Sequence, residues 1–212
     1  MLPTILALII PILTFIHGNA WFAPKPQTLA VHQFSLGDRY PVASVNNVFK
    51  DNILLATAYA TGEKLDPSSI EWNSLEKPFT YTLSLRPGQT FAFHSDVLPS
   101  YDSSSIKTPD VDFSSQEGFK SDGYLVGDGV CHLASLLYWV AKDAGLNAVA
   151  PTRHDFAPVP GVPSQYGTAI YDSGVKSESN ELQNLYITNN KDKTITFLFE
   201  NTGKDLVIKA ID

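Results

Sequence analysis

The sequence predicts an α+β protein in which one central helix, beginning at Cys131, packs on a mainly antiparallel sheet. Three observations support this fold class. Apolar residues recur at three- and four-residue steps in two segments, which is the spacing of amphipathic helices. Short alternating segments separated by turn residues fill most of the remaining chain, as strands do. Only 17% of the residues are charged and 11% are aromatic, a balance that favours a strand-rich globular protein.

The first half of the chain is expected to hold one helix and three strands. Ser44 is expected to cap the helix, and the helical pattern stops at Gly62. Strands are expected at 29–36, 78–85 and 90–93, the last two joined by a turn at 86–89. The polar segment 94–122 has no periodicity, so we expect a long surface loop; loops of that length are uncommon unless functional or mobile.

The second half is expected to begin with the central helix. This helix runs from residue 128 or 129 to 144, and Gly145 is expected to cap its C-terminus. Strands are expected at 146–150, 168–172, 185–188, 194–200 and 206–211, with hairpin turns at 189–192 and 201–204. The pattern demands no second hydrophobic core, so residues 21–212 are expected to form a single domain.

The charge balance argues against two classes of partner. Fifteen Lys and Arg against 22 Asp and Glu give the 212-residue chain a net charge of −7, the wrong sign for a surface that gathers phosphates. No nucleic acid partner is therefore expected. Basic residues do not cluster beside an amphipathic stretch, so electrostatic docking on anionic lipid is not expected either.

The N-terminal segment predicts export. Residues 5–16 form an almost unbroken apolar run, followed by the small residues Gly18, Asn19 and Ala20, where a signal peptidase would cut. We interpret residues 1–20 as a signal peptide, which places the mature protein outside the cytoplasm or in the cell envelope. The run is short of the ~20 residues that span a membrane. An uncleaved anchor is the alternative, and membrane contact is expected only through this segment.

Cys131 is the only cysteine, so it cannot form an internal disulfide. It lies in the first turn of the central helix, off the helix's main apolar stripe, where the helix dipole favours a thiolate. Gly127 and Gly129 precede it and would let a substrate backbone approach, while nearby N–H groups would hold an oxyanion. The alternative is a buried cysteine under a second layer, with the glycines serving only the turn.

A nucleophilic cysteine needs a base, and His154 is the first candidate because it follows the strand after the helix. Asp172 or Asp155 would orient it, and His94 is the second candidate base. His132 lies about 100° around the helix from Cys131 and cannot easily reach the sulfur. No pair of residues has the spacing of metal ligands, so neither a metal nor a cofactor is expected.

Three motifs carry a resemblance to a known family. They are Arg-Pro-Gly-Gln-Thr-Phe-Ala-Phe at 86–93, Gly-Asp-Gly-Val-Cys-His-Leu-Ala-Ser-Leu-Leu-Tyr at 127–138, and Ala-Gly-Leu at 144–146. With Arg153-His154-Asp155 and the strands around 186–200, the chain resembles the VanW-like family of exported bacterial proteins over roughly residues 40 to 200. The resemblance implies a cell-envelope or peptidoglycan context, and it supplies no agreed reaction.

The sequence departs from the family pattern at three places. His132 stands where the family usually has Gln, and Asp128 interrupts a purer glycine run. The family tends to have an Asp near Tyr166, which this chain lacks, so Asp172 would have to substitute. A weaker likeness is to transglutaminase-like and papain-like folds, in which a helix-start cysteine is followed by His and Asp. The order Cys131, His154, Asp172 is compatible with them, although His154 follows the helix more closely than their catalytic His usually does.

Two functions follow as hypotheses. In the first, the protein is a cysteine hydrolase or acyl transferase acting on peptidoglycan-related peptides: Cys131 attacks a carbonyl and His154 moves the proton. In the second, it is a non-catalytic module that binds peptidoglycan or an envelope peptide on an aromatic platform that includes Tyr138, Trp139 and Tyr166. The residues expected to contact the ligand are Gly127, Gly129, His132, Tyr138 and Tyr166.

Overall fold

The computed structural model describes residues 25–63, 65–101 and 105–212. Alternating apolar residues build the larger of its two sheets. Its four strands are β1 (Thr28–Ser35), β2 (Phe79–Leu85), β7 (Ile195–Asn201) and β8 (Asp205–Ile211). They are ordered β1-β8-β7-β2, and every neighbouring pair is antiparallel. In β7 the burial strictly alternates, because one side chain in two faces the core. The expected signal segment, 1–20, lies outside the described residues.

A second sheet is formed by four short strands. They are β3 (Thr90–Ala92), β4 (Ile106–Lys107), β5 (Asn147–Val149) and β6 (Tyr186–Thr188), in the order β4-β3-β6-β5. The β3–β4 pair is parallel and the other two pairs are antiparallel. The fold class is therefore α+β, as the sequence predicts, but the strands form two sheets where one was expected.

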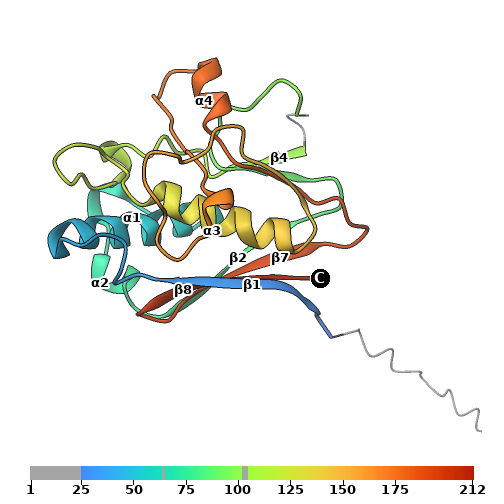
Figure 1. Cartoon of the computed structure of the whole chain (residues 1–212), viewed down its shortest axis with the longest axis horizontal. Helices are drawn as coiled ribbons and strands as arrows, with labels where there is room; N and C mark the ends of the chain where they lie inside the picture. Colours follow the sequence, from blue (N-terminus) through green and yellow to red (C-terminus); the bar gives the residue numbers. More distant parts are fainter. Residues whose placement is uncertain (1–24, 64, 102–104) are drawn as a thin grey trace, which may run out of the picture.

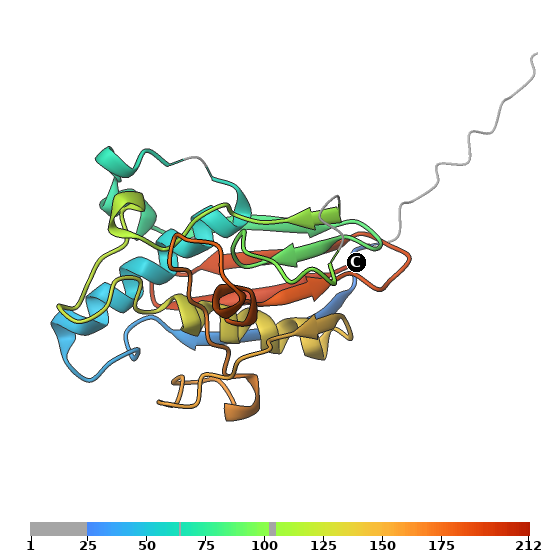
Figure 2. The same cartoon turned by 90° about the horizontal axis from the view of Figure 1, so that it is seen from above.

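Two long helices cover the same face of the larger sheet. Helix α1 (Ala43–Thr61) contacts β2, and helix α3 (Val130–Asp143) contacts β1 and β8 (Figures 1 and 2). The prediction that α1 ends at Gly62 is confirmed, since this glycine has a left-handed conformation with φ of 86°. The prediction of a Ser44 cap is wrong, because Val42 holds the N-cap position and no side chain caps the helix.

Short helical turns join these elements. They are η1 (Pro67–Ser69), α2 (Trp72–Leu75), η3 (Ser115–Glu117), η4 (Ser164–Tyr166) and α4 (Glu178–Leu182). No helix among the described residues is long and apolar enough to cross a bilayer.

Three sequence predictions of loops and strands need correction. Residues 168–172 make one isolated bridge, Arg153 to Thr168, and no strand. The turn 189–192 joins β6 to β7 in different sheets, so it is no hairpin, whereas 201–204 does join the paired strands β7 and β8. The loop 94–122 is not confined to the surface, because it contributes β4, η3, the buried apolar side chains of Val111, Phe113 and Phe119, and the buried His94. Apolar residues spaced without a period give no helix or strand signal, yet they still fill the core.

Candidate functional site

The site is built around the N-terminus of α3, where Cys131 lies in the first turn as predicted. Gly129 is the N-cap residue, with φ of 102°, and it is buried. A Cβ atom on Gly129 would lie 2.6 Å from the carbonyl oxygen of Phe49 in α1. A Cβ on Gly127 would lie 3.2 Å from the carbonyl oxygen of Phe113. These glycines therefore let the start of α3 pack against neighbouring backbone.

The Cys131 thiol contacts the backbone of one residue of a facing segment, while Cys131 as a whole residue is half-buried. The backbone N–H of Ile170 donates to Sγ at 3.3 Å, and the thiol donates to the Ile170 carbonyl oxygen at 3.5 Å. Burial, with the nearby Asp128 charge, raises the pKa of Cys131 to about 11, although the Ile170 contact acts in the opposite direction. At neutral pH the group is a thiol.

The same segment covers the rest of this helix face. One turn further along α3, the Ser135 hydroxyl accepts from the Thr168 N–H at 2.9 Å and donates to the Cys131 carbonyl oxygen at 2.7 Å. Residues 168–170 therefore run beside the start of α3 as a second layer over it. This second layer is the one that the buried-cysteine alternative expects, although Cys131 itself is half-buried and not fully covered.

His154, the first candidate base, lies in the loop that follows β5. Its Nδ1 is 2.9 Å from the carbonyl oxygen of Ala157, so Nδ1 carries the ring proton. Its ring centroid is 4.0 Å from that of Phe156 and 6.1 Å from that of His132. Among the described residues no hydrogen bond joins His154 to Cys131. The structure thus brings together His154 and His132.

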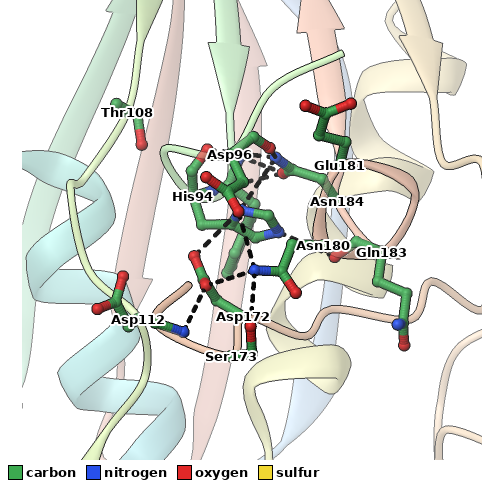
Figure 3. A network of polar contacts seen from close by, with 12 residues as sticks. His94, Asp96, Thr108, Asp112, Asp172, Ser173, Asn180, Glu181, Gln183 and Asn184 are labelled. Carbon is green, nitrogen blue, oxygen red and sulfur yellow. Dashed lines mark hydrogen bonds and ion pairs between the residues drawn. The ribbon is translucent and has the colours of Figure 1, made fainter. Parts of the chain in front are cut away.

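Asp172 lies beside His94, the second candidate base (Figure 3). The His94 Nδ1 and Asp172 Oδ2 atoms are 3.5 Å apart, and both side chains are buried. The His94 Nε2 donates to the Gln183 carbonyl oxygen at 3.0 Å. Burial lowers the pKa of His94, while the charges of Asp172, Asp96 and Asp112 act in the opposite direction. Asp172 therefore lies in place to interact with His94. His154, which Asp172 was expected to orient, instead contacts Ala157, Phe156 and His132.

Two buried asparagines hold this network together. Asn180 Nδ2 lies 2.8 Å from Asp96 Oδ2 and 2.9 Å from Asp172 Oδ1, as Figure 3 shows. Asn184 Oδ1 accepts from the Phe93 N–H at 2.8 Å, and its amide donates to the Asp96 carbonyl oxygen at 2.9 Å. These contacts fasten the end of β3 to α4 and β6. Within the described residues no three His, Cys, Asp or Glu side chains are arranged to hold a metal ion.

His132 lies near Arg39 and His154, and we define these three residues as the basic cluster. The His132 side chain packs on Phe49, with ring centroids 5.0 Å apart, and its buried Nδ1 has no partner among the described residues. Burial, with the nearby charges of Arg39 and His154, lowers the pKa of His132 to about 3. The ring is therefore neutral at physiological pH.

Three of the residues predicted to form an aromatic platform do lie together. The ring centroids of Tyr138 and Tyr166 are 5.9 Å apart at 80°, and Trp139 is nearly parallel to Tyr166 at 5.8 Å. His32 of β1 stacks on Trp139 at 3.5 Å. We call His32, Tyr138, Trp139 and Tyr166 the aromatic cluster. Asp143 fixes it by contacting His32 Nε2 at 2.7 Å and accepting from the Tyr166 hydroxyl at 3.3 Å.

Sequence reasoning missed Arg39 and the roles of His32 and Asp143. Arg39 stands in a polar stretch after the first strand, where arginines are normally solvated, so no local signal marks it as buried. His32 lies between the exposed residues Val31 and Gln33 of β1, and a single histidine in a strand gives no local signal of a stacking partner. The contact between His32 and Asp143 joins residues 111 positions apart, which a periodicity cannot reveal.

Taken together, the fold and site define a single-domain α+β protein with a lone cysteine at the start of its central helix. A family model described as "VanW like protein" matches residues 80–211, more than half of the chain, so the chain belongs to the VanW-like family. This match confirms the resemblance to the VanW-like family that the motif at 127–138 indicates. No curated protein and no solved structure matches the chain. The remote likeness to transglutaminase-like and papain-like folds therefore stays a prediction.

Proposed function

We propose that this protein is an exported module of the cell envelope that binds peptidoglycan or an envelope peptide without processing it. The observation that carries the proposal is the pair of contacts between the Cys131 thiol and the Ile170 backbone. A thiol with a pKa of about 11 is ionised in roughly one molecule in ten thousand at pH 7. Nucleophilic attack needs the thiolate, so this sulfur is poorly prepared for acyl transfer.

The aromatic cluster supports binding. Tyr138, Trp139 and Tyr166 are all half-buried, so each ring keeps a surface that a ligand can contact. The rings are held by one another and by Asp143, which lowers the entropy lost when a ligand stacks on them. Aromatic side chains with one apolar face and one polar edge suit sugar rings and peptide bonds alike. The envelope context rests on the apolar N-terminal segment and on the family.

The acyl-transfer hypothesis demands a different arrangement. A base would have to reach the sulfur, yet His94 Nε2 and His154 Nδ1 contact the carbonyl oxygens of Gln183 and Ala157, and no hydrogen bond joins either ring to Sγ among the described residues. The segment around Ile170 would also have to withdraw before a carbonyl carbon could approach Sγ. The binding role needs neither change.

A sedimentation assay with purified peptidoglycan sacculi tests the proposal. We expect the mature chain to co-sediment, and Tyr166→Ala to weaken binding by about 10-fold, as loss of a central aromatic contact does. Tyr171→Ala is the matched control, because Tyr171 is an exposed tyrosine five residues away without a ring contact in the described structure. Cys131→Ser should bind like the wild type and leave the sacculi intact. Release of soluble fragments by the wild type but not by Cys131→Ser would instead establish the enzyme.

A further inference from the structure

The strongest unexplained feature of the molecule is the buried positive charge of Arg39. The residue is 3% exposed, and its Nε and Nη1 atoms are buried without a hydrogen-bond partner. The guanidinium lies over the Phe34 ring at 4.0 Å, and no described carboxylate forms an ion pair with it. Buried arginines are almost always paired, because an unpaired charged donor loses its hydration without compensation.

The other two members of the basic cluster come from separate parts of the chain. His132 is in the first turn of α3, 5% exposed, with its Nδ1 unpartnered. His154 uses Nδ1 for the Ala157 carbonyl, which leaves Nε2 available to a ligand. Burial lowers the pKa of Arg39 to about 10, so the guanidinium keeps its charge at pH 7. The cluster thus gathers one fixed positive charge and two imidazoles whose nitrogens are not all used.

A cavity of about 190 Å³ adjoins the cluster. His154 lines it together with a mostly apolar loop that includes Phe156, Val159 and Val162. Phe156 is 79% exposed although it is a large aromatic residue, and its ring lies against His154. Gly161 belongs to the same loop without lining the cavity, and it lies near the arginine, since a Cβ there would lie 3.8 Å from Arg39 Nη2. Prolines recur along this loop, at positions 158, 160 and 163, and restrict its backbone.

We propose that the basic cluster and this cavity bind the free C-terminal carboxylate of a peptide, with the apolar side chain of its last residue inside the cavity. The planar guanidinium matches a carboxylate, and Nη2 is the nitrogen on the side of the cavity loop. Apolar residues such as Phe156, Val159 and Val162 in the lining suit a small apolar side chain, and the charged lining residues Arg153 and Asp155 contact each other at 3.4 Å. The site goes beyond the proposed function, because it is distinct from the aromatic cluster and stands if that cluster binds nothing.

The two surfaces are nevertheless neighbours. Turn η4 carries Tyr166 of the aromatic cluster, while Ser164 of the same turn and the following Gly167 line the cavity. A peptide held by its carboxylate would therefore place the residues before its C-terminus close to the aromatic rings. An envelope peptide would therefore bind with its C-terminus at the cavity and its preceding residues toward the aromatic cluster.

Calorimetric titration with N-acetyl-Ala-Ala, its C-terminal amide and inorganic phosphate tests the site on the mature chain. We expect the free acid to bind and the amide to bind at least about 10-fold more weakly, because the amide lacks the charge that completes the hydrogen bonds to Arg39. Phosphate is expected to bind more weakly than the free acid, since it leaves the apolar cavity empty. Equal binding of acid and amide overturns the proposal. Tighter binding of phosphate than of the free acid would assign the cluster to phosphate and overturn it too.

Single substitutions test which residues bind the free acid. Arg39→Gln and His154→Gln should each weaken binding of the free acid by about 10-fold or more. Arg86→Gln is the matched control, because Arg86 is an exposed arginine in the turn between β2 and β3 and does not line the cavity. It should change affinity by less than about 2-fold. If Arg39→Gln does not fold, His154→Gln and the acid-to-amide comparison decide. Loss of sacculus binding in Tyr166→Ala with unchanged dipeptide affinity would separate the two surfaces.

Discussion

The Cys131 sulfur and the backbone of Ile170 form a reciprocal pair, in which the amide donates to the sulfur at 3.3 Å and the thiol faces the carbonyl at 3.5 Å. This pair decides how the helix-start cysteine behaves. The helix N-terminus favours a thiolate, but burial disfavours the charged form and dominates, so the pKa rises. A glycine-containing turn before a helix N-terminus therefore does not by itself make the following cysteine reactive.

Iodoacetamide labelling of Cys131 is expected to be slow at pH 7 and to increase about tenfold per pH unit up to about pH 11, provided the protein stays folded. The reason is the small thiolate fraction. Mass spectrometry of the labelled peptide measures the rate. His154→Ala should leave the profile unchanged, because His154 makes no contact with the sulfur among the described residues. A profile with a midpoint near pH 7 that shifts in His154→Ala would reinstate the thiolate–imidazole hypothesis.

Much of the fold follows from local pattern, while the site does not. The helix after Gly129 and the strand pair before and after residues 201–204 could be predicted, since periodicity and turn residues act within a few positions. The division into two sheets could not, because the turn 189–192 looks like any hairpin and only long-range pairing sends β6 to β3. Likewise, the helical wheel placed Cys131 off the main stripe, but it could not show that residues 168–170 cover that face.

His132 is expected to make stability fall as the solution is acidified. Its pKa in the folded protein is about 3, below the ordinary 6.5, so the unfolded chain takes up a proton first. The stability that the neutral ring contributes is present above pH 6.5 and is lost as pH falls toward 3, by up to about 5 kcal/mol. Urea unfolding at pH 7 and pH 4 measures it. In His132→Gln the loss between these two pH values should be smaller by several kcal/mol; an unchanged difference would contradict the buried neutral ring.

Asp128 acts in the opposite direction. Burial and the nearby Asp122 raise its pKa to about 6, and its buried Oδ2 has no partner among the described residues. A raised carboxyl pKa gives stability that is present below pH 3.8 and lost as pH rises through 6. Asp128→Asn is therefore expected to stabilise the protein at pH 7.5 by about 1 kcal/mol, a value reduced for its partial exposure. Urea unfolding at pH 7.5 and pH 4 tests this, because the gain should vanish at the lower pH.

The contact between Gly129 and Phe49 is expected to be essential for the packing of α3 on α1. Gly129→Ala would place a Cβ atom 2.6 Å from the Phe49 carbonyl oxygen, and backbone atoms in two helices cannot move apart without opening the core. We expect a loss of about 2–4 kcal/mol in the free energy of unfolding. Gly88→Ala is the control, because Gly88 also has positive φ, 75°, but a Cβ there would meet nothing within 4 Å. It should cost about 1 kcal/mol, from backbone strain alone. Equal losses in the two variants would mean that Gly129 is retained for its conformation and not for the close approach of α1.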